Sequence, residues 1–405
     1  MAGLRRTLGP LGAAGIGVAS MVGAGAFYVW APGAALAGSL LWVSVIIAGT
    51  VALLNALVVA QLAMHNPVSG GVYRYGQKYL GDQAGFLAGW FFLVGKTASA
   101  AAIAAIAGRY LWPENSTLIA VGLLAVFAAA NLSGIRTTAI ISILSALVVV
   151  GTLVVVLVGA RGEGSFIAEG GTPETWGVMN AAGLIFFAFA GYARMATLGD
   201  EVKNPSRVLP RVIVVTLLGV LALYGALVVV LLSTLGPAEL AQSPVPLAQI
   251  APQGMVPWVV AVAGLASLGS LAAVLAGLSR TSMAMADSGD LPARLGRVWT
   301  RTSSPAIAEI TMAVGAMIAV ALVDTVWLVG ASSSAVLSYY AIAHACALRA
   351  PAAERILPVI TPWVGLMMCL ALVVTLPWQS LATGGVVFVC GLVIWRIRHK
   401  PTLNH

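Results

Sequence analysis

Residues 15–27 read Gly-Ile-Gly-Val-Ala-Ser-Met-Val-Gly-Ala-Gly-Ala-Phe and lie inside the first of many apolar segments of membrane-crossing length. Gly15, Gly17, Gly23 and Gly25 loosen this segment, because a glycine costs about 1 kcal/mol relative to alanine in a helix interior. A helix that breaks inside a bilayer is tolerated only where protein or a water-filled cavity faces the break. The stretch therefore predicts a broken membrane helix, whose free backbone groups form a candidate ligand-binding site.

The composition is that of a membrane protein. Of 405 residues, 60% are hydrophobic and 8% are charged, whereas about 25% are charged in a soluble domain. About 20 apolar residues cross a bilayer, and this length predicts an all-α integral membrane protein with 12 transmembrane helices. The predicted spans are 11–33, 39–63, 85–111, 117–134, 139–160, 178–199, 211–235, 256–279, 305–323, 326–348, 356–376 and 379–395. The longest outer loop, at about 236–255, is expected to be a surface segment.

The positive charges indicate the orientation in the membrane. With the N-terminus in the cytoplasm, 17 of the 21 Lys and Arg residues fall on the cytoplasmic side of these spans. This is the positive-inside bias, so the net charge of +8 points to a membrane and not to a nucleic acid. We expect a multi-pass protein of the cell membrane with both termini in the cytoplasm.

Other function classes lack the residues they need. No His/Cys cluster has metal-ligand spacing, and no Walker-type loop is present, so neither a cofactor, nor a metal, nor ATP-driven transport is expected. An intramembrane enzyme would need a nucleophile–base pair within the spans, and none is found.

A second glycine-interrupted stretch occurs in the sixth span, at residues 183–191 (Gly-Leu-Ile-Phe-Phe-Ala-Phe-Ala-Gly). Broken helices at corresponding positions of two halves are typical of secondary transporters built from inverted repeats. We therefore expect a first repeat at 1–160, a second at 161–350, and two peripheral spans with a cytoplasmic tail at 351–405. The alternative is that these glycines serve only helix packing.

Four sequence motifs together resemble the amino acid–polyamine–organocation (APC) superfamily of amino acid permeases. They are residues 21–27; Ala60-Gln61-Leu62-Ala63 with Pro67, Ser69, Gly70, Gly71, Tyr73 and Tyr75; residues 186–192 continuing to 200–205 and Pro210-Arg211; and Ser279-Arg280 continuing through 285–292. The resemblance implies a five-plus-five inverted repeat with discontinuous helices 1 and 6, and an amino acid bound near the middle of the bilayer.

The resemblance also implies which backbone groups hold the substrate. A carboxylate suits the N–H groups that begin the half-helix after the first break, which belong to Gly23, Ala24, Gly25 and Ala26. An ammonium group suits the carbonyls before the breaks, which belong to Ala19, Ser20, Phe187, Ala188 and Gly191. Phe189 or Tyr192 is a candidate aromatic gate, with ordinary packing as the alternative.

The chain departs from the family pattern at its charges. Gln61 stands where glutamate is common, and Val149 lies near the position of a lysine that many members carry in span 5. Lys96 and Arg194 instead lie inside spans, at a cost of about 2.5–3.5 kcal/mol each on insertion scales. We expect Lys96 to replace the missing lysine, as a fixed cation or by titrating, or else to pair with backbone carbonyls.

The remaining candidates have weaker signals. Arg194 is expected to steady span 6 through an ion pair or capping contact, with contact to an anionic substrate as the alternative. His344 in span 10 is a candidate proton relay, with helix packing favoured, and His65 is expected at the interface.

These features predict a secondary transporter of amino acids or related amines, driven by protons or by exchange. An exporter or exchanger of neutral amino acids is the first alternative, and a channel is the alternative from a different class. The Ala and Gly walls around the breaks favour a small or neutral substrate, whereas Lys96 and Arg194 favour an anionic one. The expected partners are the substrate, the lipid bilayer and protons; direction of transport and oligomeric state stay open.

Overall fold

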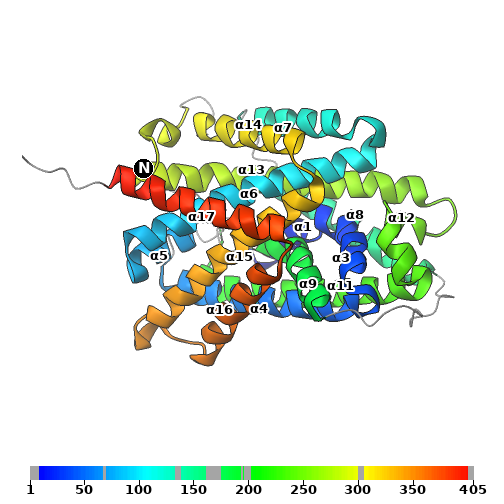
Figure 1. The fold of residues 1–405 in the computed structure, drawn as a ribbon, viewed down its shortest axis with the longest axis horizontal. Coiled ribbons are helices and arrows are strands. Elements are labelled where there is room, and N and C mark those ends of the chain that lie inside the picture. The colour runs from blue at the N-terminus through cyan, green and yellow to red at the C-terminus, as the bar shows by residue number, and fades with distance from the viewer. Residues whose placement is uncertain are drawn as a thin grey trace, which may run out of the picture.

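The chain is described by a computed structural model that covers residues 9–66, 70–132, 138–160, 175–192, 195, 202–299 and 305–399. Within these ranges every regular element is a helix (Figure 1). The all-α prediction is confirmed to that extent.

The long helices alternate with short helical turns that connect them. The elements are α1 (Pro10–Met21), α2 (Ala24–Tyr28), α3 (Trp30–Ala37), η1 (Gly38–Leu40), α4 (Leu41–His65), α5 (Val72–Leu80), α6 (Asp82–Leu111), η2 (Pro113–Asn115), α7 (Ser116–Leu132), α8 (Thr138–Gly159), α9 (Thr175–Phe189), η3 (Ala190–Tyr192), α11 (Pro205–Gln242), α12 (Pro246–Gln249), α13 (Val256–Asp287), η4 (Ala293–Gly296), α14 (Ala306–Leu322), α15 (Thr325–Arg349), η5 (Ala352–Glu354), α16 (Ile360–Thr375) and α17 (Trp378–Arg398).

Most of these helices have the length and apolar composition of membrane spans. In the described residues, nine helical segments meet both criteria, and three shorter apolar helices lie at Ile143–Gly159, Ala306–Leu322 and Ile360–Thr375. Each of the twelve predicted spans overlaps one or two of these segments within the described residues. The chain is therefore a multi-pass membrane protein; the number of crossings and the five-plus-five repeat stay predictions.

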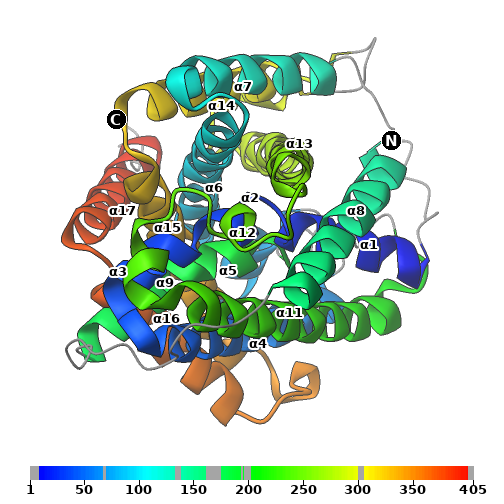
Figure 2. The ribbon, with the colours of Figure 1, turned by 90° about the vertical axis from the view of Figure 1, so that its right-hand side faces the viewer.

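Small side chains bring the central helices close together. Helix α6 packs against α13 and α15, and its residues Ala100, Ala101 and Ala102 are fully buried. Small residues let membrane helices approach closely. Figure 2 shows α6 and α13 inside the bundle, with α7 and α14 along one edge and α4 and α11 along the opposite edge.

The outer helices present apolar side chains to their surroundings. Leu118 on α7 is 70% exposed, and Ile318 on α14 and Val386 on α17 are also exposed. Exposed apolar surface of this kind marks a membrane interaction in a helical protein. These faces are therefore suited to lipid contact.

Two of the loop motifs meet beside α5. The hydroxyl of Tyr73 donates a hydrogen bond of 2.6 Å to Oδ2 of Asp290, which joins the second motif to the fourth. Burial and this hydrogen bond raise the pKa of Tyr73 to about 12, so the hydroxyl keeps its proton at neutral pH. The N–H of Val72 also donates to the hydroxyl of Tyr339, at 3.3 Å, which ties α5 to α15.

The expectation of a surface segment at 236–255 is wrong for its middle part. Helix α11 kinks at Gly236, whose φ is 71°, and continues to Gln242. The short helix α12 then buries Pro246, Leu247 and Ala248 and contacts α2 and α13. The Pro- and Gln-rich composition resembled an exposed loop, but three apolar residues within it fill a gap in the bundle.

Gln61 provides a test of how the last two helices are attached. Its Oε1 accepts hydrogen bonds from the N–H groups of Ile356, at 2.8 Å, and Leu357, at 2.7 Å. We expect Gln61→Leu to lose about 1–3 kcal/mol of stability, because two hydrogen bonds to one buried acceptor are lost. Gln61→Glu keeps two acceptor oxygens and is the matched control. Apparent melting temperature in detergent measures both, and an unchanged value for Gln61→Leu contradicts this anchoring role.

Candidate functional site

The first predicted break is present between α1 and α2. Val22 (φ −83°, ψ 63°) and Gly23 (φ −116°, ψ −147°) have non-helical backbone angles. The N–H of Gly23 turns back to the carbonyl oxygen of Met21, at 2.9 Å. The helix resumes at Ala24 and leads through Val29, whose backbone is helical, into α3. The first N–H groups after the break have no acceptor within their own helix.

The two earlier glycines of the opening stretch lie within continuous helix. A Cβ atom on Gly15 would overlap Ile143, and a Cβ atom on Gly17 would overlap the sulfur of Met195. Both glycines therefore let neighbouring helices pack closely against α1, as the packing alternative predicted.

In the stretch 183–191, the helix is interrupted only near its end, at Ala190, and not at Gly183. Gly183 lies within α9, which stays helical to Phe189, and Ala190–Tyr192 forms the 3₁₀ turn η3. Arg194, Asp200 and Glu201 lie outside the described residues. The described part of the break is therefore its first half, where carbonyl groups lose their helical partners.

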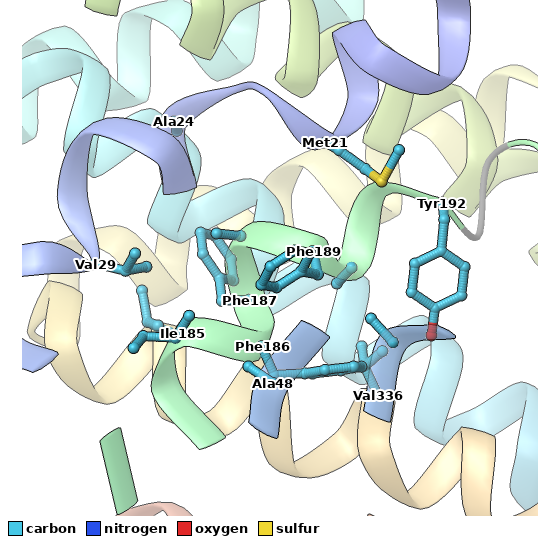
Figure 3. Packing of buried hydrophobic residues seen from close by; sticks show 14 of the residues in the cluster. Met21, Ala24, Val29, Ala48, Ile185, Phe186, Phe187, Phe189, Tyr192 and Val336 are labelled. Atoms are coloured by element: carbon cyan, nitrogen blue, oxygen red, sulfur yellow. The ribbon is translucent and has the colours of Figure 1, made fainter. Parts of the chain in front are cut away.

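The two breaks contact each other backbone to backbone. A Cβ atom on Gly25 would lie 2.7 Å from Cα of Ala188, and one on Gly191 would overlap the carbonyl group of Ser20. Figure 3 shows the chain between Met21 and Ala24 passing over the end of α9 near Phe187 and Phe189. Only glycine fits at Gly25 and Gly191 without displacing the opposite backbone.

Tyr224 on α11 connects the two breaks. Its hydroxyl lies 2.8 Å from the carbonyl oxygen of Met21 and 3.4 Å from that of Ala188. Its fully buried ring makes an edge contact with Phe189, at 5.0 Å between centroids. One hydroxyl proton serves one carbonyl at a time, so Tyr224 favours the shorter bond to Met21. The sequence analysis missed this residue, although a tyrosine within an apolar span is itself a signal.

Lys96 on α6 reaches the second break. Its Nζ atom donates a hydrogen bond of 3.1 Å to the carbonyl oxygen of Ala190, and the residue is only 7% exposed. The two ion pairs found among the described residues, Lys78–Glu354 and His399–Asp290, lie elsewhere. The ammonium group thus satisfies a carbonyl that the helix break has freed, which is the carbonyl pairing considered above.

A small cavity of about 30 Å³ joins the two breaks and Lys96. The predicted substrate-binding residues that line it are Ser20, Gly23, Ala24, Gly25, Phe187, Ala188 and Gly191. The lining residues that the sequence analysis missed are Met21, Ser99, Ile103, Ala190, Ser270 and Val274. None of these described lining residues is acidic. The volume suits about one water molecule, so a molecule of the size of an amino acid would fit only after the helices around the cavity had moved apart.

The other predicted site residues lie outside this cavity. Those residues are Ala19, Ala26, Phe189 and Tyr192. Phe189 packs on Tyr224, as described above, and the ring of Tyr192 lies 5.2 Å from that of Tyr340. Neither aromatic candidate covers the cavity in this conformation.

Two larger cavities differ in character from the small one. One of about 200 Å³ is lined by Arg109, Asp324 and Thr325 beside the ends of α6 and α15. Another of about 410 Å³ lies between α6, α14, α15 and α17 and has mainly apolar walls. Neither is lined by residues of the two breaks, so the small cavity is the candidate substrate site.

Comparison of the whole sequence with known proteins gives the family that the four motifs resemble. The sequence model of the family described as amino acid permease matches residues 8–402. An uncharacterized transporter of Mycobacterium tuberculosis is 42% identical over 98% of this chain and 92% of its own length. The branched-chain amino acid permease of Bacillus subtilis is 26% identical over 97% and 92%. A chloroplastic cationic amino acid transporter of Arabidopsis thaliana is 27% identical over 94% and 72%.

The contact between the breaks predicts a sharp difference between two glycines. Gly191→Ala should lower stability by about 1–3 kcal/mol or more, because the added methyl group overlaps the backbone of Ser20. Gly219→Ala on α11 is the matched control, since a Cβ atom there meets nothing within 4 Å. Yield of monodisperse protein and apparent melting temperature measure the effect. Equal behaviour of the two variants would refute a tight contact at Gly191.

Tyr224 gives a second test of the same region. Tyr224→Phe keeps the ring but removes one of the two donors to the carbonyl of Met21, at a cost of about 0.5–1.5 kcal/mol. Tyr110→Phe is the control, because the hydroxyl of Tyr110 donates to the carbonyl of Phe27, at 3.0 Å, outside the contact between the breaks. We expect both variants to lose stability but only Tyr224→Phe to weaken substrate binding, measured by ligand-induced thermal shift. Equal substrate affinity in both variants would count against this role.

Proposed function

The chain belongs to the amino acid permease family, as its four motifs predicted, and from this membership we propose that it is a secondary active transporter of amino acids or related amines. Alternating access between two sides of the cell membrane would carry the substrate. One observation supports this most: two interrupted helices, far apart in sequence, meet at one buried cavity with free backbone groups. Such sites are where transporters of this construction bind their substrates.

The proposed substrate pose follows from the polarity of the two breaks. The substrate carboxylate would accept hydrogen bonds from the N–H groups of Ala24 and Gly25, at the positive end of the half-helix. The α-ammonium group would donate to carbonyls on the other side of the cavity, at Ser20 and Ala188. Both pairs line the same space, so an amino acid can engage both after the cavity widens.

Lys96 is proposed to act as a fixed cation in this site. Val149, which lies near the position of the family's span-5 lysine, is buried on α8. The membrane cation of this chain is Lys96, whose ammonium group donates a hydrogen bond to the carbonyl oxygen of Ala190. A buried charge needs partners, and the described cavity walls provide carbonyls and hydroxyls but no carboxylate. Lys96 would thus hold the second break together between transport events. Arg194 keeps its proposed role of steadying span 6.

Two alternatives follow from specific observations. For the alternative of an exporter or exchanger of neutral amino acids, the neutral substrate is supported by the small, largely apolar cavity walls and by the name of the Bacillus subtilis relative, a branched-chain amino acid permease. A channel is the alternative from a different class, but no ring of charge or carbonyl filter has been identified in the sequence.

In the proposed transporter, protons or exchange would drive transport. The chain would cross the membrane twelve times, with both termini in the cytoplasm.

Counterflow into proteoliposomes tests the proposed function. Purified full-length protein is reconstituted in vesicles loaded with one unlabelled amino acid, and entry of the same labelled amino acid is followed for a panel of acidic, neutral and basic substrates. We expect saturable, stereoselective exchange for at least one class, and a matching thermal shift, because a ligand of the folded state raises apparent stability. Non-saturable flux without stereoselectivity would indicate a channel, and absence of flux for every solute would refute transport.

The role of Lys96 has its own test. Lys96→Ala removes the charged donor to Ala190, an interaction worth about 1.5–3 kcal/mol, so substrate affinity or counterflow rate should fall about tenfold or more. Lys78→Ala is the matched control, because Lys78 is an exposed lysine paired with Glu354, at 3.3 Å. Wild-type rate and pH dependence in Lys96→Ala would rule out a role in coupling or binding.

A further inference from the structure

A second buried polar cluster lies beside the helix breaks, and the substrate pose above makes no use of it. His344 on α15 is completely buried. Its Nε2 atom lies 2.8 Å from Oδ1 of Asn55 on α4, and the thiol of Cys369 on α16 donates to the same oxygen, at 3.1 Å. A histidine among apolar spans that makes specific polar contacts is a candidate for function.

The orientation of the Asn55 amide assigns the form of the imidazole. With Oδ1 of Asn55 turned toward His344, Nε2 is the donor and carries a proton, and Nδ1 of the neutral ring is then a bare acceptor. No described residue is a partner for Nδ1. A buried acceptor without a partner costs about 1–3 kcal/mol, so Nδ1 can take a proton once water reaches the cluster.

The surrounding helices leave room for this ring. A Cβ atom on Gly365 of α16 would overlap Cε1 of His344 and would lie 2.7 Å from Nδ1. Any residue larger than glycine there would displace the imidazole. Helix α16 therefore contributes both a donor, through Cys369, and the space that the ring occupies.

A chain of buried polar groups lies between this cluster and the candidate cavity. The hydroxyls of Tyr340 and Tyr192 and Nδ2 of Asn55 make no hydrogen bond of regular geometry, but the hydroxyl of Tyr192 lies close enough to interact with both Tyr340 and Asn55. Tyr340 precedes His344 by one turn of α15, and its ring lies 5.2 Å from that of Tyr192. Tyr192 directly follows Gly191, which lines the cavity. Movement of η3 would therefore change what His344 can reach.

We propose that His344 is the proton-binding site that couples proton movement to substrate transport in this permease. The inference rests on the proposed function and adds the coupling ion and its carrier. When η3 moves and water reaches the cluster, Nδ1 of neutral His344 accepts a proton and the ring becomes an imidazolium. The same proton leaves Nδ1 toward the opposite side after the breaks have changed conformation. No covalent bond to the substrate forms or breaks.

The groups that face His344 are polar but form no ion pair with it in the described structure. The titratable ones are Tyr340, one turn earlier on α15, Tyr192 on η3, whose ring packs on Tyr340, and Cys369 on α16, which shares Asn55 with His344. Helix α6 also packs against α15 and carries Lys96, whose ammonium group binds Ala190 at the start of η3. A positive charge on His344 would therefore arise near η3, the element that Lys96 binds. Protonation of His344 would favour separation of η3 from Lys96.

Proteoliposomes with an internal pH indicator test this proposal, using a substrate found by counterflow. In the wild type, we expect substrate entry to carry protons and an imposed pH gradient to drive accumulation. His344→Gln retains an amide donor for Asn55 but cannot carry a proton. It should lose gradient-driven accumulation and the indicator signal by at least about tenfold, while substrate counterflow stays within about threefold of wild type. His65→Gln, at the end of α4, is the matched control and should keep all three activities.

The outcomes separate this inference from the proposed function. Counterflow without any proton signal in the wild type, or full accumulation by His344→Gln, overturns the role of His344 and leaves the transporter intact. Absence of counterflow for every solute overturns both. If His344→Gln does not fold, Tyr192→Phe takes its place, because it removes a hydroxyl on the path to the cavity. A reduced ratio of proton flux to counterflow in Tyr192→Phe supports the proposal, and an unchanged ratio refutes it.

Discussion

The backbone groups freed at the two helix breaks impose the constraint on which the rest of the structure depends. Lipid provides no hydrogen bonds, so every such group needs a partner inside the bundle. Tyr224 supplies a donor at Met21, and Lys96 supplies one at Ala190. Ala24 and Gly25, which follow the first break, line the cavity instead. The groups left for a ligand are thus the ones that an amino acid could complement.

The motifs that carry the family resemblance pair up in space. The first and third motifs meet at the helix breaks, where Gly25 lies against Ala188. The second and fourth meet at the loop helix α5, where Tyr73 binds Asp290. Segments that are separated by more than a hundred residues therefore form one region at the helix breaks and one loop region. The long helix α6 begins next to the second region and carries Lys96 into the first.

Local features of the sequence predicted much of the fold. Apolar length located the helices, because each crossing is set by bilayer thickness, and the glycine-rich stretch located the interruption before Ala24. Tyr224, Ser270 and Val274 could not be assigned to the site from sequence, since their roles depend on how α11 and α13 pack across the bundle. The buried helix α12 was missed for a related reason, because its composition resembles a loop while its neighbours decide its burial.

The backbone-to-backbone contact between the breaks also limits how substrate preference can diverge in evolution. At Gly25 and Gly191 no side chain is present to vary, and any larger residue would separate the helices. New specificities would have to arise on the remaining walls, where Ser99 and Ile103 of α6 and Ser270 and Val274 of α13 face the cavity. A library that randomises these four positions, with both glycines held constant, would explore the accessible substrate range of this scaffold.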